Sequence, residues 1–170
     1  KLTEELKQAL LQAETKQRIE DLYLPYKPKR RTRAQIAKEA GLEPLANSLF
    51  ENPTLTPETE AARFLNEEKG IKSIKDALNG AQDILAARFA KALSHPARIA
   101  IVRLLANHNA CCYCGDLTTE LPIAQSTISQ HLKVLKDVGL IDGEIAPPKV
   151  CYRINRENLL LAKKLFSELL

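Results

Sequence analysis

The chain has 170 residues, of which 45 % are hydrophobic and 27 % charged, and these proportions exclude a disordered chain and favour a globular one. No apolar run approaches the ~20 residues that a membrane-spanning helix needs. The first residues, KLTEELKQAL, lack the pattern of a signal peptide, so a cytoplasmic protein is expected. The net charge of +4 is compatible with nucleic-acid binding without demonstrating it.

The first half of the sequence has the pattern of a series of helices. Residues 2–24 place apolar side chains at helical spacing, with acidic residues in the first turn, which predicts one long amphipathic helix. Thr56 and Ser73 are typical of residues that cap the start of further helices. Because no proline or glycine lies between Gly80 and Ser94, the helix opened by Ser73 is expected to continue to about Ser94.

A basic run, YKPKRRTR, occupies residues 26–33 between predicted helices. Aromatic side chains next to cations are typical of proteins that bind single-stranded nucleic acid. The prolines in the run are equally typical of a solvated connector. Both interpretations stay open at this point.

The second half has the pattern of a helix-turn-helix. Residues 116–121 predict a short helix, which is followed by a turn that contains Pro122. The next helix spaces Ile128, Leu132 and Leu135 so that all three face the same side. Two short helices joined by such a turn predict helix-turn-helix geometry.

A hairpin and a last helix follow this motif. Residues 141–145 and 150–154 alternate in polarity around Pro147 and Pro148, which predicts a small two-stranded antiparallel β-wing. The tail from residue 155 to 170 predicts an apolar helix that forms a dimer face or packs on the first half. The expected fold class is mainly α, with a helical N-terminal region joined to a winged helix-turn-helix domain.

The second helix of the motif carries small, amide-bearing and basic side chains opposite its apolar face. Such side chains reach base edges and phosphates when a helix enters the major groove of DNA. The candidate DNA-binding residues are Gln125, Ser126, Thr127, Ser129, Gln130, His131, Lys133 and Lys136. For His131 a packing role is an alternative to a DNA contact, and His95 is expected to be a capping or surface residue.

Three of the four cysteines lie within NACCYCGDL, residues 109–117. Thiolates are soft ligands, so Cys111, Cys112 and Cys114 are candidate ligands for a thiophilic ion. Three sulfurs suit As(III) or Sb(III) better than zinc, which prefers four ligands. Thiol oxidation, with Cys114 bonded to Cys111 or Cys112, and a purely structural role are the alternatives.

Cys151 lies within the second predicted strand of the wing. Strand alternation predicts that its side chain points outward, opposite to Val150 and Tyr152. The expectation is a bystander, with a fourth ligand as the alternative.

Enzymatic activity is not expected. The sequence contains no phosphate-binding glycine loop, no HExxH, no GxSxG and no pair of acids with the spacing of a shared site. No histidine is placed to act as a base toward Cys114.

Residues 16–46, KQRIEDLYLPYKPKRRTRAQIAKEAGLEPLA, resemble part of the N-terminal helical region of the bacterial Tex transcription accessory proteins. The resemblance continues to about residue 90. It implies that the first half, residues 1–90, is a helical fragment similar to part of a larger protein.

From KALSHPARIAIVRLL to the end, residues 91–170 resemble the ArsR family of winged-helix repressors, and STISQHLKVLKDVGLI is the specific part. The resemblance implies a homodimeric repressor of double-stranded DNA that an inducer releases. The expected dimer surface combines the C-terminal helix with the helix near residues 81–93. Cys112, Cys114 and Asp116 match the C-x-C-D inducer site of this family, with Gly115 inserted.

The two resemblances meet near residues 90 and 91, inside one predicted helix, and together they indicate a chimera. The function expected from the whole sequence is an ArsR-type repressor that needs no cofactor and is released by As(III), Sb(III) or another thiophilic ion. The alternatives are a thiol-redox-responsive repressor and an engineered or recombinant fusion without selected activity.

Overall fold

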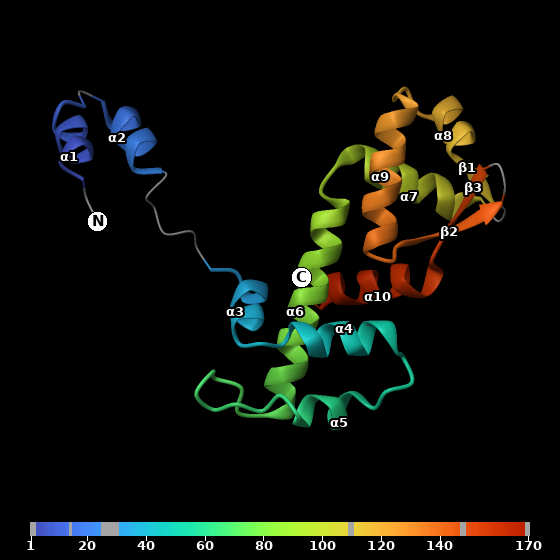
Figure 1. The fold of residues 1–170 in the computed structure, drawn as a ribbon, viewed down its shortest axis with the longest axis horizontal. Helices are drawn as coiled ribbons and strands as arrows, with labels where there is room; N and C mark the ends of the chain where they lie inside the picture. The colour runs from blue at the N-terminus through green and yellow to red at the C-terminus, as the bar shows by residue number, and fades with distance from the viewer. Residues whose placement is uncertain (1–2, 14, 25–30, 109–110, 147–148, 169–170) are drawn as a thin grey trace. The chain divides into compact units, whose positions relative to one another are not determined.

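The computed structural model describes residues 3–13, 15–24, 31–108, 111–146 and 149–168 (Figure 1). It divides into two compact units, residues 1–32 and 33–170. None of the described helices is long and apolar enough to cross a membrane. Pro147 and Pro148 at the expected wing tip lie outside the described residues, as do Leu169 and Leu170.

The first unit contains two helices, α1 (Glu4–Leu11) and α2 (Lys16–Tyr23). The expectation of one long helix is therefore wrong. A second helix starts because Thr15 caps it: the backbone N–H of Arg18 donates to the Thr15 hydroxyl over 3.3 Å. Side chains at helical spacing can belong to two short helices as well as to one long helix.

The second unit contains the remaining elements and is mainly α. Its helices are α3 (Arg33–Glu39), α4 (Glu43–Glu51), α5 (Pro57–Ala62), α6 (Ile74–Leu93), α7 (Pro96–Asn107), α8 (Cys114–Glu120), α9 (Gln125–Asp137) and α10 (Arg156–Ser167). Its strands are β1 (Cys112–Tyr113), β2 (Ile141–Ala146) and β3 (Lys149–Ile154).

Helix α6 is the central helix of this unit, and it runs without a break from Ile74 to Leu93, as predicted. A capping box starts it, because the Ser73 hydroxyl accepts from the backbone N–H of Asp76, and the Asp76 carboxylate accepts from that of Ser73. Gly80 allows close packing, since a Cβ there would clash with Leu42 Cδ1 and lie 3.2 Å from Ala37 Cβ.

The sheet has three antiparallel strands in the order β1-β3-β2. Strands β2 and β3 form the predicted wing, with Ile141 opposite Ile154. The wing has two strands as predicted, and the sequence did not predict the third strand of the sheet, β1, in which Cys112 pairs with Tyr152 and Tyr113 with Cys151. Two residues are too few to show an alternating pattern, so no local pattern indicates β1.

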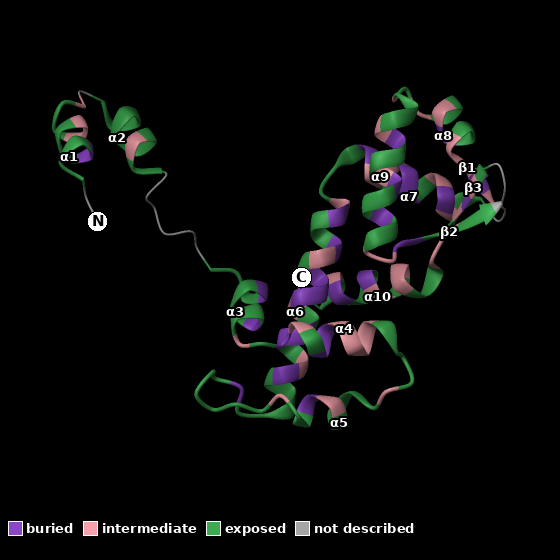
Figure 2. Ribbon diagram, in the orientation of Figure 1, coloured by how far each residue is buried: buried purple, intermediate pink, exposed green. Residues whose placement is uncertain are grey.

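One hydrophobic core extends through the second unit, from Ala37 in α3 to Leu165 in α10. Figure 2 shows buried residues along α6 and on the inner side of α9. The domain boundary expected at residues 90 and 91 falls inside α6, where this core is continuous. The division by contacts falls between residues 32 and 33, and the boundary near residues 90 and 91 stays a prediction.

Candidate nucleic-acid interface and cysteine site

Helix α9 is held on the core by three fully buried side chains, as the sequence pattern predicts. Ile128, Leu132 and Leu135 are all 0 % exposed, and Leu117 of α8 is buried with them. A short turn at residues 121–124, which contains Pro122, separates the two helices and completes the helix-turn-helix. Because the apolar face is occupied, the orientation of the opposite face of α9 is fixed.

The predicted DNA-binding residues all lie on α9, outside its buried apolar face. Six of them are exposed and two are half-buried. The exposed residues are Gln125, Ser126, Ser129, Gln130, Lys133 and Lys136, and the half-buried ones are Thr127 and His131. The structure thus brings the predicted set together on one accessible helix surface.

His131 lies at the flank of α9 and contacts the start of α7. Its ring centroid is 4.6 Å from that of His95, whose Nδ1 accepts from the backbone N–H of Ala97 over 3.1 Å and so caps α7 as predicted. Burial, followed by the positive charge of His95 and Arg98, lowers the pKa of His131. These contacts favour the packing role over the DNA contact for His131.

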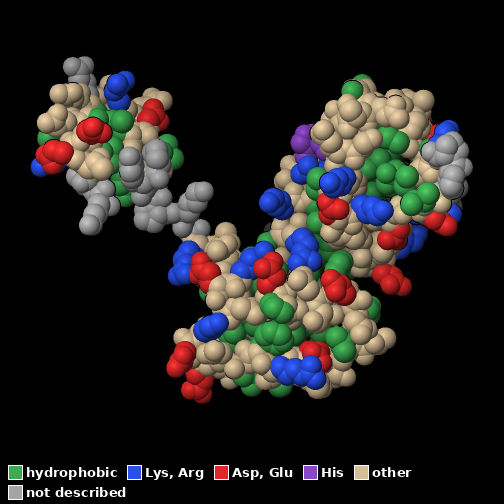
Figure 3. All heavy atoms as spheres, viewed as in Figure 1, with side chains coloured by type: hydrophobic (Ala, Val, Ile, Leu, Met, Phe, Trp, Pro, Cys, Tyr) green, Lys and Arg blue, Asp and Glu red, His purple; other side chains and the backbone are tan. Residues whose placement is uncertain are grey.

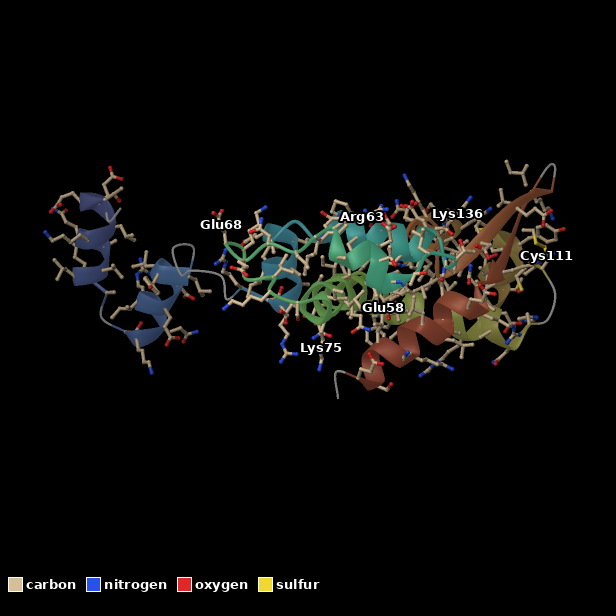
Figure 4. All side chains as sticks on the ribbon, turned by 90° about the horizontal axis from the view of Figure 1, so that it is seen from below. Glu58, Arg63, Glu68, Lys75, Cys111 and Lys136 are labelled. Atoms are coloured by element: carbon tan, nitrogen blue, oxygen red, sulfur yellow. A yellow bond between two sulfur atoms is a disulfide. The ribbon has the colours of Figure 1, made fainter. Side chains whose placement is uncertain are left out.

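Lys136 connects α9 to the wing. Its Nζ donates to the carbonyl oxygen of Gly143 in β2 over 3.5 Å (Figure 4). The turn that leads from α9 to β2 contains Gly139 at φ +72°, and its carbonyl accepts from Asn158 Nδ2 over 2.8 Å. A Cβ at Gly139 would lie 3.0 Å from Phe50 Cζ of α4. Phe50 of α4 therefore lies next to the turn that leads into the wing.

Cys111 forms a disulfide with Cys151, with the two Cα atoms 5.5 Å apart (Figure 4). The expectation that Cys151 points outward as a bystander is wrong, because its side chain is only 3 % exposed. The reason is β1, which places Cys151 on the central strand of the sheet. The disulfides expected with Cys114 are not formed, since Cys112 and Cys114 are free.

Cys112 and Cys114 differ in their surroundings. Cys112 is buried, and desolvation, followed by the negative charge of Asp116, raises the pKa of its thiol. Cys114 is half-buried, and its Sγ lies 3.5 Å from Ser129 Oγ and 3.9 Å from the Gln125 carbonyl oxygen. The Cys114 thiol thus contacts α9 directly.

The structure does not bring Cys111, Cys112 and Cys114 together as three free thiols, because Cys111 is bonded to Cys151. In the described part of the chain, no three His, Cys, Asp or Glu side chains are grouped to hold a metal ion. Sequence reasoning missed the role of Cys151 and the contact between Cys114 and Ser129. The even number of cysteines is a signal for pairing, but it does not give the connectivity.

Comparisons with known proteins match two parts of the chain. Residues 93–144 match the model of a helix-turn-helix domain family, and residues 52–98 match a family described as Tex central region-like. The Tex protein of Bordetella pertussis is 62 % identical over 91 residues, which are 54 % of this chain and 12 % of that protein. The chain therefore spans only a small part of this relative.

The second half has relatives of its own. The HTH-type transcriptional repressor SmtB of Mycobacterium tuberculosis is 39 % identical over 69 residues, or 41 % of this chain and 50 % of that protein. A solved structure, the ArsR-like transcriptional regulator from Rhodococcus sp. RHA1, is 25 % identical and gives a TM-score of 0.44 over 50 % of this chain and 78 % of its own. The chain thus joins a segment similar to the Tex central region to a helix-turn-helix domain similar to that of an HTH-type transcriptional repressor.

Proposed function

We propose that the chain is a DNA-binding transcriptional repressor in which α9 reads double-stranded DNA. The observation that carries the proposal is the division of α9 into two faces. Ile128, Leu132 and Leu135 are fully buried, whereas most of the amide, hydroxyl and amino groups on the other face are exposed. A helix anchored in this way presents one surface to the major groove without rearrangement.

The chemistry of the exposed face suits base reading. Gln130 can bond in a bidentate manner to the N6 and N7 atoms of adenine, and Gln125 offers the same groups one turn earlier. Lys133 supplies a positive charge for a backbone phosphate. In the wing, Lys149 and Arg153 are exposed and can contact phosphates on one side of the reading helix.

We propose that the chain acts as a homodimer through α10 and the helix near residues 81–93. Support comes from Leu160 of α10, an apolar side chain that is 64 % exposed and that a second copy of the chain would cover. Two copies of α9 about 34 Å apart would then read adjacent major grooves. A molecular mass measured by light scattering tests this assembly, and a monomer contradicts it.

We further propose that As(III) or Sb(III) releases the repressor from DNA by binding to Cys112 and Cys114. Cys111 would supply the third sulfur after reduction of its disulfide. The support is the position of Cys114, because an ion that draws its Sγ away from Ser129 alters a contact with α9. Because buried Cys112 must lose a proton to bind, the affinity should rise with pH.

A redox-responsive repressor is the second candidate, and the Cys111–Cys151 disulfide is the observation that favours it. In this version the two thiols lose two protons and two electrons to an oxidant such as a peroxide. The bond then ties the segment before β1 to β3, close to α8. Release from DNA would follow oxidation and not ion binding.

Selection from a random pool of duplex DNA tests the reading function. The reduced chain should enrich one sequence that competitor DNA does not displace. Alanine at Lys136 should weaken binding to all sequences alike and reduce the dependence of affinity on salt. A pool that stays random contradicts the proposal and favours a fusion without selected activity.

Two titrations of the selected DNA complex separate the two candidates for release. As(III) added to the reduced complex should release DNA and produce sulfur-to-arsenic absorption, and the Cys112→Ser, Cys114→Ser variant should do neither. Peroxide added without As(III) should release DNA only in the redox candidate, and Cys151→Ser should abolish that release. If As(III) leaves the complex intact, metalloid sensing is contradicted.

A further inference from the structure

A groove of about 600 Å³ lies between α6 and the C-terminal half of α9, beside the DNA-reading face. We refer to it as the α6–α9 groove. Ile84 and Ala87 of α6 line one wall, and Val134 and Val138 of α9 line the other. Val134 is 37 % exposed, so a valine on the flank of the reading helix remains in water. The groove has an apolar floor without a covering element in the described residues of its unit.

Basic side chains surround this floor. Lys38 of α3, Arg88 and Lys91 of α6 and Arg98 of α7 line the groove, whereas Asp137 is its acidic lining residue. Figure 3 shows Lys and Arg side chains over α6 and the adjoining part of α9. The groove therefore combines apolar contact area with a positive rim.

The partners of these cations leave the rim positive. Lys38 is paired with Glu43, with 2.6 Å between Nζ and Oε1. Arg88, in contrast, donates to the neutral amide oxygen of Asn47, and Arg98 donates to backbone carbonyls at the end of α6. Lys91 is exposed. Glu43 thus offsets the charge of Lys38 and part of that of Arg88. A bound carboxylate would meet the remaining positive charge of Arg88, Lys91 and Arg98.

The spacing of the α6 wall fits a helical partner. Ile84, Ala87, Arg88 and Lys91 follow the i, i+3, i+4, i+7 pattern, so they form one stripe along α6. The stripe is about 10 Å long at ~1.5 Å per residue, which matches about two turns of a second helix. Helix-in-groove recognition uses apolar anchors at this same spacing.

DNA fits the groove less well than a protein partner does. A phosphate backbone gains nothing from the valines and alanine of the floor, whereas an apolar helix face does. An amphipathic helix with leucines on one side and glutamates on its flanks satisfies both the floor and the rim. The groove also combines Arg88 and Lys91 from the Tex-like match with Val134 from the helix-turn-helix match, so neither similar segment contains it alone.

We propose that the α6–α9 groove binds an acidic amphipathic helix of a partner protein. The apolar face of that helix packs on Ala87, Val134 and Val138, and its glutamates face Arg88 and Lys91. The proposal does not depend on DNA binding, because the groove is formed by the fold of residues 33–170. It requires that the proposed dimer surface use other faces of residues 81–93, because Ala87, Arg88 and Lys91 line the groove.

The probe is a fluorescent synthetic helix of about 16 residues, with leucines at i, i+3, i+4 and i+7 and glutamates on both flanks. Anisotropy is measured with the full chain. Two control peptides are a scrambled sequence of the same composition and a version with lysine in place of glutamate. The acidic helix should bind at least about tenfold more tightly than either control, and added salt should weaken it.

Two variants place the binding in the groove. Lys91→Glu reverses one rim charge, and Val134→Ser removes apolar contact from the floor. Each should weaken peptide binding by about tenfold. Lys163→Glu, a matched charge reversal on an exposed lysine of α10, should change it less than about twofold. Circular dichroism and light scattering confirm that each variant keeps its fold and its mass.

Three results would overturn the proposal. The first is equal binding of the acidic and scrambled peptides, and the second is unchanged peptide binding by both groove variants. The third result combines two measurements. The parent chain does not bind the peptide, and the Lys91→Glu variant no longer binds duplex DNA or has the mass of a monomer where the parent is a dimer. In that case the groove serves a phosphate backbone or a second copy of the chain.

Discussion

Helices α6 and α9 use the same backbone geometry for different purposes. Helix α6 is packed against α3, α4, α5, α7 and α10, and its buried positions include Ala77, Gly80 and Ala81, whose small size permits close approach. Helix α9 has leucine and isoleucine on one side and exposed polar side chains on the other. A helix surrounded by others contributes mainly to stability, whereas a helix packed on one side leaves a face free for binding.

The comparison predicts which substitutions affect folding and which affect binding. On α9 the two effects should separate by face. On α6 the size of a side chain should matter more than its polarity at buried positions, because the neighbouring helices leave no room.

The largest loss of stability is expected from the inner face of α9. Leu132→Ala removes a fully buried side chain and should lower the free energy of unfolding by about 2 to 5 kcal/mol. Urea denaturation followed by circular dichroism measures it. Gln130→Ala, on the exposed face, is the control and should stay within about 0.5 kcal/mol of the parent. Equal losses for both variants would break the distinction between the two faces.

A smaller loss is expected from close packing at α6. Gly80→Val places side-chain atoms against buried Leu42 and Ala37 and should cost about 1 to 3 kcal/mol. Gly115→Val is the matched control, because a Cβ at Gly115 has no neighbour within 4 Å. Thermal unfolding of both variants provides the comparison, and a Gly80→Val chain as stable as the control would show that α6 is not tightly enclosed.

Helix α10 follows the wing and packs on α6, so its start is a further test of how this unit is stabilised. Asn155 caps it, because the backbone N–H of Asn158 donates to Asn155 Oδ1 over 3.0 Å. Asn155→Ala should therefore lower the free energy of unfolding by about 0.5 to 2 kcal/mol. Asn155→Ser keeps a capping oxygen without placing a second carboxylate beside Asp142, whose carboxylate accepts from Asn155 Nδ2, and it should recover most of the loss in the same urea titration. Failure of this rescue would assign the effect to another contact of Asn155.

The smallest effect is expected at His131, on the flank between the two faces of α9. The pKa of His131 is lowered in the folded protein. Below the ordinary pKa of 6.5, His131 therefore binds a proton more readily in the unfolded chain than in the folded one. The contribution of His131 to the free energy of unfolding is complete above about pH 6.5, and it is lost as the pH falls through the pKa that His131 has in the folded protein. Glu43 and Asp76, whose pKa values are also lowered, lose their contributions only at more acidic pH.

Urea denaturation at about pH 7.5 and about pH 5.5 tests this pH dependence. The parent should lose more stability between the two values than His131→Gln does. An identical loss in both chains would mean that the pair formed by His95 and His131 does not contribute.

The sequence predicted most of this fold where local patterns are long enough. The spacing of Ile128, Leu132 and Leu135 identified the inner face of α9, and Ser73 identified the start of α6. The break between α1 and α2 was missed, because the apolar spacing continues across Thr15.

The candidate cysteine site was less predictable. The partner of Cys111 depends on the pairing of β1 with β3, which is a contact between residues about forty positions apart. Burial of Cys151 depends on the same pairing. The contact of Cys114 with Ser129 depends on how α8 packs on α9, and no local pattern reports it.

The central claim is that the exposed face of α9 reads DNA, and Gln130→Ala tests it most directly. Affinities of parent and variant are measured for the selected duplex and for duplexes with single base changes, at one salt concentration. The variant should lose about 1 to 3 kcal/mol of discrimination at one base pair, whereas Gln82→Ala, an exposed glutamine of α6, should lose none. Equal discrimination by the parent and Gln130→Ala would contradict the claim.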